Sequence, residues 1–262
     1  MTSTSADFAL LREDVSTPFA RGRFGIERKP LKIGKIEVEA MASPVSSCLD
    51  MLIKLPGSDV VLPAPYRATF VAEVLDQALS FEDDLLSGWR DTHYVYITVD
   101  QRRLVPGKTH RNAGWHFDGM QGARYPVKLD ACHQYVVASV LPTEYSKQAL
   151  NAEGLDELRH NWFVELGAQV SHGSDNVITG QAGDIMLMSA YQLHRSPVAP
   201  ANADVTRTFV RIDFSLKQQD RLGNSLNPEL DAPFEFFERK LPEGLKYTID
   251  DAGWHGASIL VN

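Results

Sequence analysis

The chain has 262 residues, of which 44% are hydrophobic and 23% charged, and its formal net charge is −8. These values are typical of a soluble globular protein and exclude a disordered or fibrous chain. The acidic balance argues against nucleic acid as a partner, because nucleic-acid binders depend on clustered lysine and arginine. No apolar stretch approaches the roughly 18 residues that cross a bilayer, so we expect no membrane partner.

The expected compartment is the cytoplasm. The segment Met1 to Asp14 lacks a basic region followed by an apolar core, so it does not resemble a signal peptide. The two cysteines, Cys48 and Cys132, are far apart in the sequence and suggest neither a zinc pair nor a disulfide framework.

Hydrophobic periodicity predicts several strands and two helices. Residues 1–20 are rich in Ser, Thr and Ala and are expected to form a loose N-terminal arm. Apolar residues recur at helical spacing over Tyr66–Leu79 and again between Leu155 and Val170. Short apolar or alternating runs indicate strands at Leu31–Met41, Met51–Leu62, His93–Val99, Gln134–Leu141, Ile185–Ser189 and Arg207–Phe214.

No repeat, low-complexity tract or linker divides the rest of the chain. We therefore expect residues 21–262 to form one domain, with its core at about 93–215. Many short strands with a few helices favour a mainly β domain of the α+β class with helical cover.

A His-x-Asp motif occurs at His116-Phe117-Asp118. On an extended segment residues i and i+2 point to the same face, so His116 and Asp118 would converge while Phe117 points away. An imidazole and a carboxylate are two of the three ligands of the facial triad that holds Fe(II). Because the chain has 8 histidines, one such pair could also arise by chance, so the motif needs a third ligand.

His194 is the candidate third ligand. It follows the apolar run Ile185–Ser189, which begins after a Gly183-Asp184 turn. Such a turn feeding a buried strand would deliver His194 to a core site from a rigid element. The alternative is an exposed loop histidine beside Arg195.

Two other polar residues flank the motif. His133 could serve as an alternative ligand, although its place at the start of a buried strand favours a core histidine. Asn112 lies four residues before His116 and could contact a co-substrate, although an asparagine next to a glycine-containing turn is also ordinary loop chemistry.

Arg207 and Arg211 lie on the strand that follows His194. Arginine binds a carboxylate through two parallel hydrogen bonds, and an inward-pointing arginine needs an anionic partner. A dicarboxylate co-substrate would supply one. The two arginines share a face of the strand, so spacing does not choose between them. The alternative is that both are exposed and salt-bridged, for example to Asp213, and this interpretation is favoured for Arg211.

Taken together, these segments resemble a known family. The segments WHFD (Trp115–Asp118), AGDIMLMSAYQLH (Ala182–His194) and RTFVRIDF (Arg207–Phe214) resemble the core of the Fe(II)/2-oxoglutarate-dependent dioxygenases. Their order and spacing are similar to the phytanoyl-CoA hydroxylase-like branch. The matching core covers roughly residues 94–214, a little under half of the chain. The resemblance implies a double-stranded β-helix, a cupin-like jelly-roll barrel with helices packed on one sheet.

The resemblance also implies a site and a reaction. It implies that His116, Asp118 and His194 are the catalytic iron ligands, and that Arg207, with Arg211 as the alternative, binds the distal carboxylate of 2-oxoglutarate. The implied cofactors are Fe(II), 2-oxoglutarate and O₂. Halogenating relatives replace the carboxylate ligand by a small residue, so Asp118 favours hydroxylation or a related oxidation. We expect a small-molecule substrate, since no basic surface or repeat suggests a polymer.

Two other functions fit the same residues. A cupin-like isomerase or binding protein could use the three ligands without 2-oxoglutarate, and in that case Arg207 would face solvent. A degenerate family member could have a regulatory or structural role, and its metal content would distinguish it.

Overall fold

Two antiparallel sheets form the framework of the protein. The computed structural model describes residues 5–118, 132–156, 159–171, 173, 175–234 and 236, and the backbone of 248–250 and 253–255. The larger sheet has the order β1 (Leu31–Lys35), β7 (Asp184–Ser189), β4 (His133–Ala138), β9 (Thr206–Ser215), β3 (Tyr94–Arg103) and β2 (Cys48–Lys54). The smaller sheet has the order β6 (Val177–Thr179), β5 (Glu144–Ser146) and β8 (His194–Arg195), and β10 (Thr248–Asp250) pairs with β11 (Gly253–His255).

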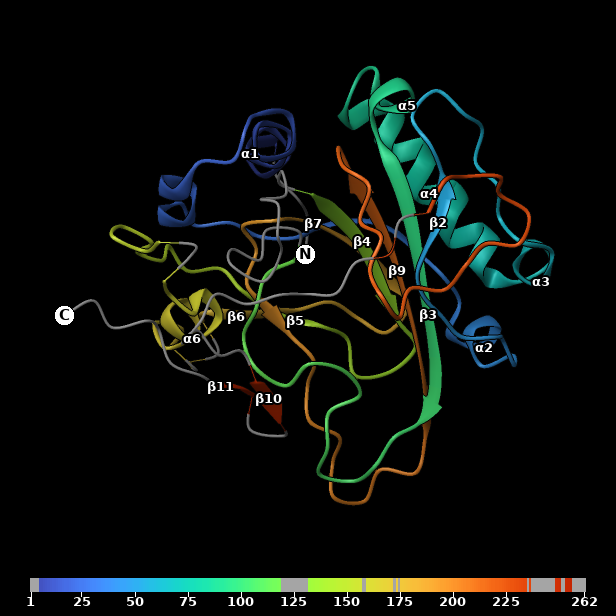
Figure 1. Ribbon diagram of the computed structural model, residues 1–262. Helices are drawn as coiled ribbons and strands as arrows, with labels where there is room; N and C mark the ends of the chain where they lie inside the picture. The colour runs from blue at the N-terminus through green and yellow to red at the C-terminus, as the bar shows by residue number, and fades with distance from the viewer. Residues whose placement is uncertain are drawn as a thin grey trace.

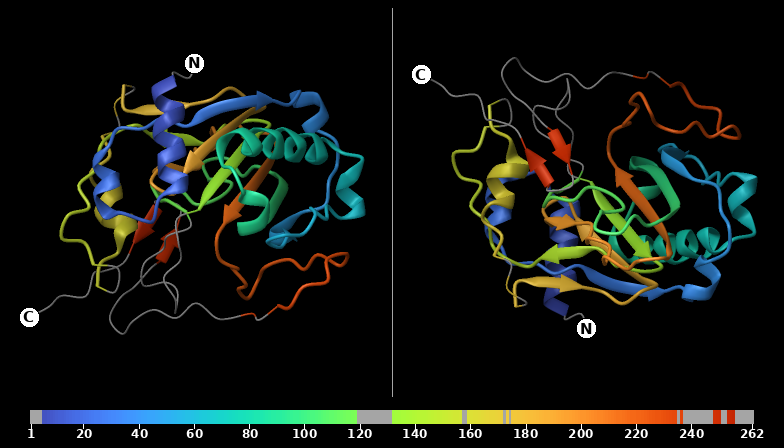
Figure 2. Two further views of the ribbon diagram at one scale, coloured as in Figure 1. Left: turned by 90° about the horizontal axis from the view of Figure 1, so that it is seen from above. Right: turned by 90° about the horizontal axis from the view of Figure 1, so that it is seen from below.

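Helix α4 (Phe70–Leu85) lies on one face of the larger sheet and the smaller sheet lies on the other (Figure 1). Figure 2 shows α4 and α6 (Trp162–Gly167) at opposite sides of the molecule. The described helices are α1 (Ser5–Ser16), α2 (Val38–Met41), α3 (Ala64–Arg67), α4 (Phe70–Leu85), α5 (Trp89–Thr92), α6 (Trp162–Gly167) and a 3₁₀ turn at Arg21–Gly25. Within the described ranges, none of these helices combines the length and apolar character that crossing a membrane requires.

Helix α4 covers the outer face of the larger sheet. Thr69 caps its N-terminus by accepting a hydrogen bond from the backbone N–H of Val71 at 3.2 Å. Its apolar stripe is buried in one cluster with alternate residues of the central strands. That cluster includes Val71, Val74, Leu75 and Ala78 of the helix and Tyr135, Val137, Leu187, Val210 and Ile212 of the sheet.

The inner face of the larger sheet meets the smaller sheet. Residues that alternate with the outer cluster, among them Val136, Met188 and Phe209, pack with Tyr145 of β5. The space between the two sheets is therefore lined from β4, β7 and β9 on one side and from β5 and β8 on the other. The predicted mainly β architecture with helical cover is confirmed.

The N-terminal segment differs from the loose arm expected for residues 1–20. Ser5–Ser16 forms α1, which buries Leu11 and Asp14. The Asp14 carboxylate accepts hydrogen bonds from Ser189 of β7 at 2.8 Å and from Arg28 at 3.2 Å. These buried polar contacts join the helix to the sheet. Composition gave no sign of them, because the partners of Asp14 are distant in sequence.

Several predicted elements have different bounds. The strand expected over Met51–Leu62 is β2, which begins at Cys48 and ends at Lys54. The strand expected over Leu31–Met41 ends at Lys35 and is followed by α2. The helix expected over Tyr66–Leu79 divides into α3 and α4 at the Thr69 cap and continues to Leu85. Between Leu155 and Val170 the described helix is only α6, which begins after the Asn161 cap.

A buried polar cluster joins α4 to the larger sheet. Glu82, which has no exposed surface, accepts a hydrogen bond of 2.6 Å from the Tyr135 hydroxyl. His133 Nε2 lies 2.9 and 3.0 Å from the two oxygens of the same carboxylate. The His133 ring stacks on Phe214 at 5.2 Å between centroids. Glu82 therefore has partners for both oxygens in a fully buried layer.

We expect Glu82→Gln to lower the free energy of unfolding by about 2 kcal/mol, because glutamine has one acceptor oxygen where glutamate has two, so one of the buried contacts with His133 and Tyr135 is lost. Asp84→Asn, on an exposed position of the same helix, should change it by less than about 0.5 kcal/mol. Urea unfolding of both variants measures the difference. Equal stabilities would show that the cluster contributes little.

A second prediction concerns pH. Burial, with a smaller contribution from His133, lowers the pKa of His93 to about 4. In the unfolded chain the same group titrates near 6.5, so between about pH 6.5 and pH 4 the unfolded state binds the proton and the folded state does not. Stability should therefore fall as pH drops through this window, by at most about 1.4 kcal/mol per pH unit from this group. His93→Gln should unfold with a shallower pH dependence; an unchanged slope would contradict the assignment.

Candidate metal centre

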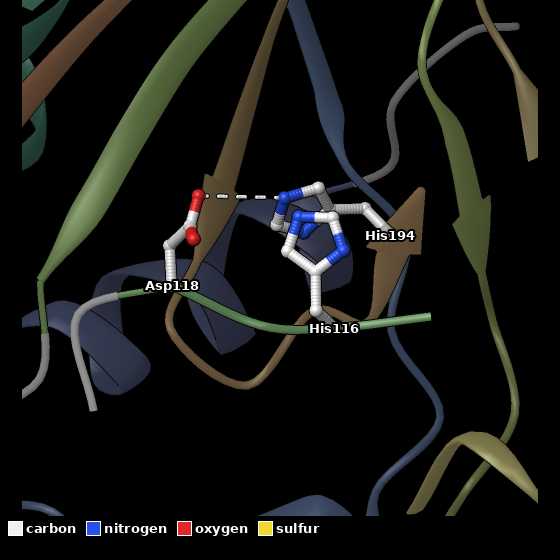
Figure 3. A group of neighbouring side chains, drawn as sticks. All are labelled: His116, Asp118 and His194. Carbon is white, nitrogen blue, oxygen red and sulfur yellow. Dashed lines mark ion pairs between the residues drawn. The ribbon is translucent and has the colours of Figure 1, made fainter. Parts of the chain in front are cut away.

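Backbone pairing brings the three predicted ligands together. The N–H of His116 donates to the carbonyl of His194 at 3.0 Å, and the N–H of His194 donates back to the carbonyl of His116 at 2.8 Å. One donor atom from each of His116, Asp118 and His194 lies within 4.8 Å of the others. Figure 3 shows the two imidazoles and the carboxylate facing one common point, with His194 Nε2 3.5 Å from Asp118 Oδ2.

Both imidazoles present Nε2 to that point. His116 Nδ1 lies 2.7 Å from the carbonyl of Gly114, and His194 Nδ1 lies 3.0 Å from the carbonyl of Gln192. A carbonyl can only accept, so each Nδ1 carries the proton and each Nε2 carries the lone pair when the ring is neutral. This is the arrangement found in metal-binding histidines, in which the second nitrogen donates to a fixed acceptor.

The alternation of the extended segment buries Phe117 on the opposite side. Its ring packs against Phe24 at 5.2 Å and Phe163 at 5.1 Å between centroids. This apolar cluster is separate from the cluster between the two sheets. Phe117 thus anchors the segment while His116 and Asp118 face the cavity.

The electrostatics keep His116 and Asp118 in metal-binding forms. Burial, followed by the proximity of His194, lowers the pKa of His116 to about 3, so the ring is neutral near pH 7. Burial alone would raise the pKa of Asp118. The Arg211 guanidinium and the two imidazoles outweigh it and hold that pKa well below its ordinary value. Neutral imidazole and ionised carboxylate are the forms that bind metal.

Arg207 is buried in the same cavity and has no carboxylate partner within the described ranges. Its side chain is among the largest fully buried ones, at 1% exposure. Its Nε donates to the carbonyls of Val140 and Leu141 at 3.0 and 3.1 Å, and its Nη1 lies 2.9 Å from His110 Nδ1. Among the described residues it forms no ion pair. A buried cation held only by neutral acceptors is suited to an incoming anion.

Arg211 is surrounded by carboxylates. It lies 2.9 Å from Asp118 Oδ2, 2.5 Å from Asp50 Oδ1 and 2.9 Å from Asp213 Oδ2. The expected ion pair with Asp213 is present. The side chain is largely buried, at 13% exposure, so the expectation of an exposed ion pair was wrong: the strand turns this face into the cavity. Arg211 has little capacity left for a further anion.

His133 does not belong to the metal centre. Its ring contacts Glu82 and Phe214 beneath α4, on the outer face of the larger sheet. Asn112 does line the cavity. Its backbone carbonyl accepts a hydrogen bond of 3.1 Å from the N–H of Ser196.

Sequence reasoning missed three polar neighbours of the centre. His110 supports Arg207, Arg111 lines the cavity, and Asp50 holds Arg211. His110 and Arg111 directly precede the segment with the metal motif, and their proximity to it was an available signal. Asp50 gave none, because it lies on β2, far from the motif in the sequence.

The cavity is narrow. Its walls come from both sheets and from the segment before His116, and they enclose about 30 Å³ of free space. A metal ion fits among the donor atoms described above. A larger ligand requires side chains of the cavity to move as it enters. The lining residues are Arg111, Asn112, His116, Asp118, Val136, Thr143, Met188, His194, Arg195, Ser196, Arg207, Phe209 and Arg211.

Solved structures align with this chain at low sequence identity and low TM-score. The alignment with EvdO2 from Micromonospora carbonacea var. aurantiaca covers 56% of this chain at 14% identity and a TM-score of 0.35. It covers 63% of the EvdO2 chain, which is less than two thirds of that protein's length. EvdO2 complexed with 2-oxoglutarate aligns over 81% and 83% of the two chains, at 13% identity and a TM-score of 0.36. The non-haem monooxygenase ThoJ aligns over 70% of each chain, at 15% identity and a TM-score of 0.33.

No family model matches the chain. No curated protein matches it either.

We expect His116→Ala and Asp118→Ala each to abolish tight Fe(II) binding while the fold is kept, because each removes one of three ligands. Calorimetric titration with Fe(II) under anaerobic conditions measures the affinity, and circular dichroism checks the fold. His160→Ala, outside the centre, is the matched control and should bind like the wild type. Wild-type affinity in His116→Ala would remove His116 from the ligand set.

Proposed function

We propose that the protein is an Fe(II)- and 2-oxoglutarate-dependent oxygenase acting on a small-molecule substrate. The observation that carries the proposal is one cavity that holds two imidazoles with Nδ1 fixed by backbone carbonyls, one ionised carboxylate, and a buried arginine that pairs with no carboxylate among the described residues. The first three groups suit a metal ion, and the fourth suits an anion next to it.

The donor set fits Fe(II). Two histidines and one carboxylate on one side of a metal form the facial triad of non-haem iron oxygenases, which leaves positions open for other ligands. Both histidines are buried, and the lowered pKa values of His116 and Asp118 keep these two groups in their binding forms. His116, Asp118 and His194 would hold the metal, with Asp118 filling the position that a halide would otherwise need. Hydroxylation or a related oxidation is therefore favoured over halogenation.

Arg207 would hold the co-substrate. A carboxylate at its free guanidinium face would neutralise the buried charge and accept charge-assisted hydrogen bonds. When bound, iron and 2-oxoglutarate would supply oxidative decarboxylation by O₂, which yields succinate and CO₂ and transfers the second oxygen atom to a substrate C–H bond. The chain's part is to fix the ligands through the Gly114 and Gln192 carbonyls and to orient the dicarboxylate through Arg207.

The strand order supports a double-stranded β-helix. From β3 to β9 the chain alternates between the two sheets. Strands β3, β4, β7 and β9 belong to the larger sheet. Between them the chain passes in turn through the His116 bridge, through β5 and β6, and through β8, which lie on the side of the smaller sheet. Such alternation is the pattern of a two-sheet jelly roll. We also propose the cytoplasm as the compartment.

The alternative of a cupin-like metal protein that does not use 2-oxoglutarate predicts a solvent-facing Arg207. The 1% exposure of Arg207 counts against that alternative. The alternative retains the same three metal ligands, so only co-substrate binding separates the two functions.

We expect Arg207→Gln to weaken 2-oxoglutarate binding about 30-fold or more and to leave Fe(II) binding unchanged, because a desolvated carboxylate would lose its charged partner. Calorimetric titration of the Fe(II)-loaded protein under anaerobic conditions measures both affinities. Arg103→Gln, at an exposed position on β3, serves as the control. Undiminished binding in Arg207→Gln, or no binding to the wild type, would contradict the proposal.

A further inference from the structure

A second depression, which we call the entry groove, adjoins the metal cavity. It has a volume of about 460 Å³, within the usual range for small-molecule sites. Arg111 and Asn112 line both the groove and the metal cavity, so the two spaces meet at these side chains. The remaining lining residues are Ser47, Cys48, Leu49, Val99, Asp100, Arg102 and Ser225.

Arg111 is poorly neutralised at this junction. Its Nη1 lies 3.3 Å from Asp100 Oδ2, and no other carboxylate among the described residues pairs with it. Asp100 also contacts Arg102 and lies 3.3 Å from His110 Nε2. One carboxylate thus serves three basic side chains.

The environment of Arg111 is apolar and positive. Its guanidinium lies over the Phe209 ring at 5.0 Å from the centroid. Burial, with Arg211 as the next contribution, lowers the pKa of Arg111 to about 10, so the side chain is still charged near pH 7. The side chain is 23% exposed, so part of it remains accessible.

The other arginines that line the cavity have an anionic partner in the protein or an assigned ligand. Arg195 has Glu144 at 2.6 Å, and Arg211 has its three carboxylates. Arg207 is assigned to 2-oxoglutarate by the proposed function. Arg111 therefore remains as a cation available for a second anion at the boundary between metal and groove.

We propose that the primary substrate carries an oxyanion, a carboxylate or a phosphate, which binds Arg111 while the rest of the molecule occupies the entry groove. This inference rests on the proposed function, because it identifies a substrate class for the same site. The guanidinium fork suits both oxyanions. Because Arg111 borders the metal cavity, the carbon that is oxidised lies close to the anionic group.

The test uses benzoate, phenyl phosphate and neutral benzamide as probes of similar size. Each is titrated by calorimetry, in low-chloride buffer, into the full-length protein loaded with Zn(II) and 2-oxoglutarate, with Zn(II) replacing iron so that no turnover occurs. At least one of the two anions should bind saturably and benzamide should not. The stronger anion identifies the oxyanion.

Arg111→Gln should weaken binding of that anion about tenfold or more, the effect of a charged hydrogen bond. Arg111→Lys should give an intermediate affinity, and Arg103→Gln should match the wild type. Affinity for 2-oxoglutarate should be unchanged in Arg111→Gln, which also shows that this variant is folded.

Three results overturn the inference. The first is that neither anion binds. The second is that anion binding survives in Arg111→Gln. The third is that Arg111→Gln loses affinity for 2-oxoglutarate as Arg207→Gln does, which would assign Arg111 to the co-substrate. Failure of the proposed function gives a different result: the wild type does not bind 2-oxoglutarate in either metal form. The anion titrations are then repeated with Zn(II) alone, and dependence on Arg111 would still identify an anion site.

Discussion

The reciprocal hydrogen bonds between His116 and His194 are the interaction on which the site depends. They join two segments that are far apart in the sequence and hold the imidazole centroids 4.4 Å apart. With each Nδ1 fixed by a carbonyl, the rings cannot rotate without losing a buried hydrogen bond. Asp118 completes the group because it lies two residues beyond His116 on an extended segment.

The two arginines of β9 are both largely buried, but their charges are balanced differently. Arg211 lies among Asp50, Asp118 and Asp213, so its charge is balanced by the protein and it orients the Asp118 carboxylate. Arg207 forms hydrogen bonds with two carbonyls and His110, and it pairs with no carboxylate among the described residues. An uncompensated buried charge is costly, and an anionic ligand would remove that cost. The same reasoning applies to Arg111, and it is why we propose an anionic substrate group between the metal cavity and the entry groove.

The sequence predicted the parts of the site that depend on local periodicity. The i, i+2 rule placed His116 and Asp118 on one face, and the apolar run before His194 indicated a rigid strand. The choice between Arg207 and Arg211 could not be predicted, because both share one face of β9. It depends on Asp50, whose place on β2 follows only from the sheet order. Asp50 also has a left-handed backbone, with φ of 42°, which no local motif indicates. The helix at Ser5–Ser16 was missed for a similar reason, since the contacts of Asp14 with Arg28 and Ser189 are tertiary.

The central claim is that one cavity holds iron through three side chains and a dicarboxylate through Arg207. A crystal structure of the protein with Fe(II) and 2-oxoglutarate, grown without oxygen, tests it most directly. The account predicts iron bound to Nε2 of His116, Nε2 of His194 and a carboxylate oxygen of Asp118, with the distal carboxylate of 2-oxoglutarate on Arg207. Iron bound elsewhere, or the distal carboxylate on Arg211 instead, would contradict it.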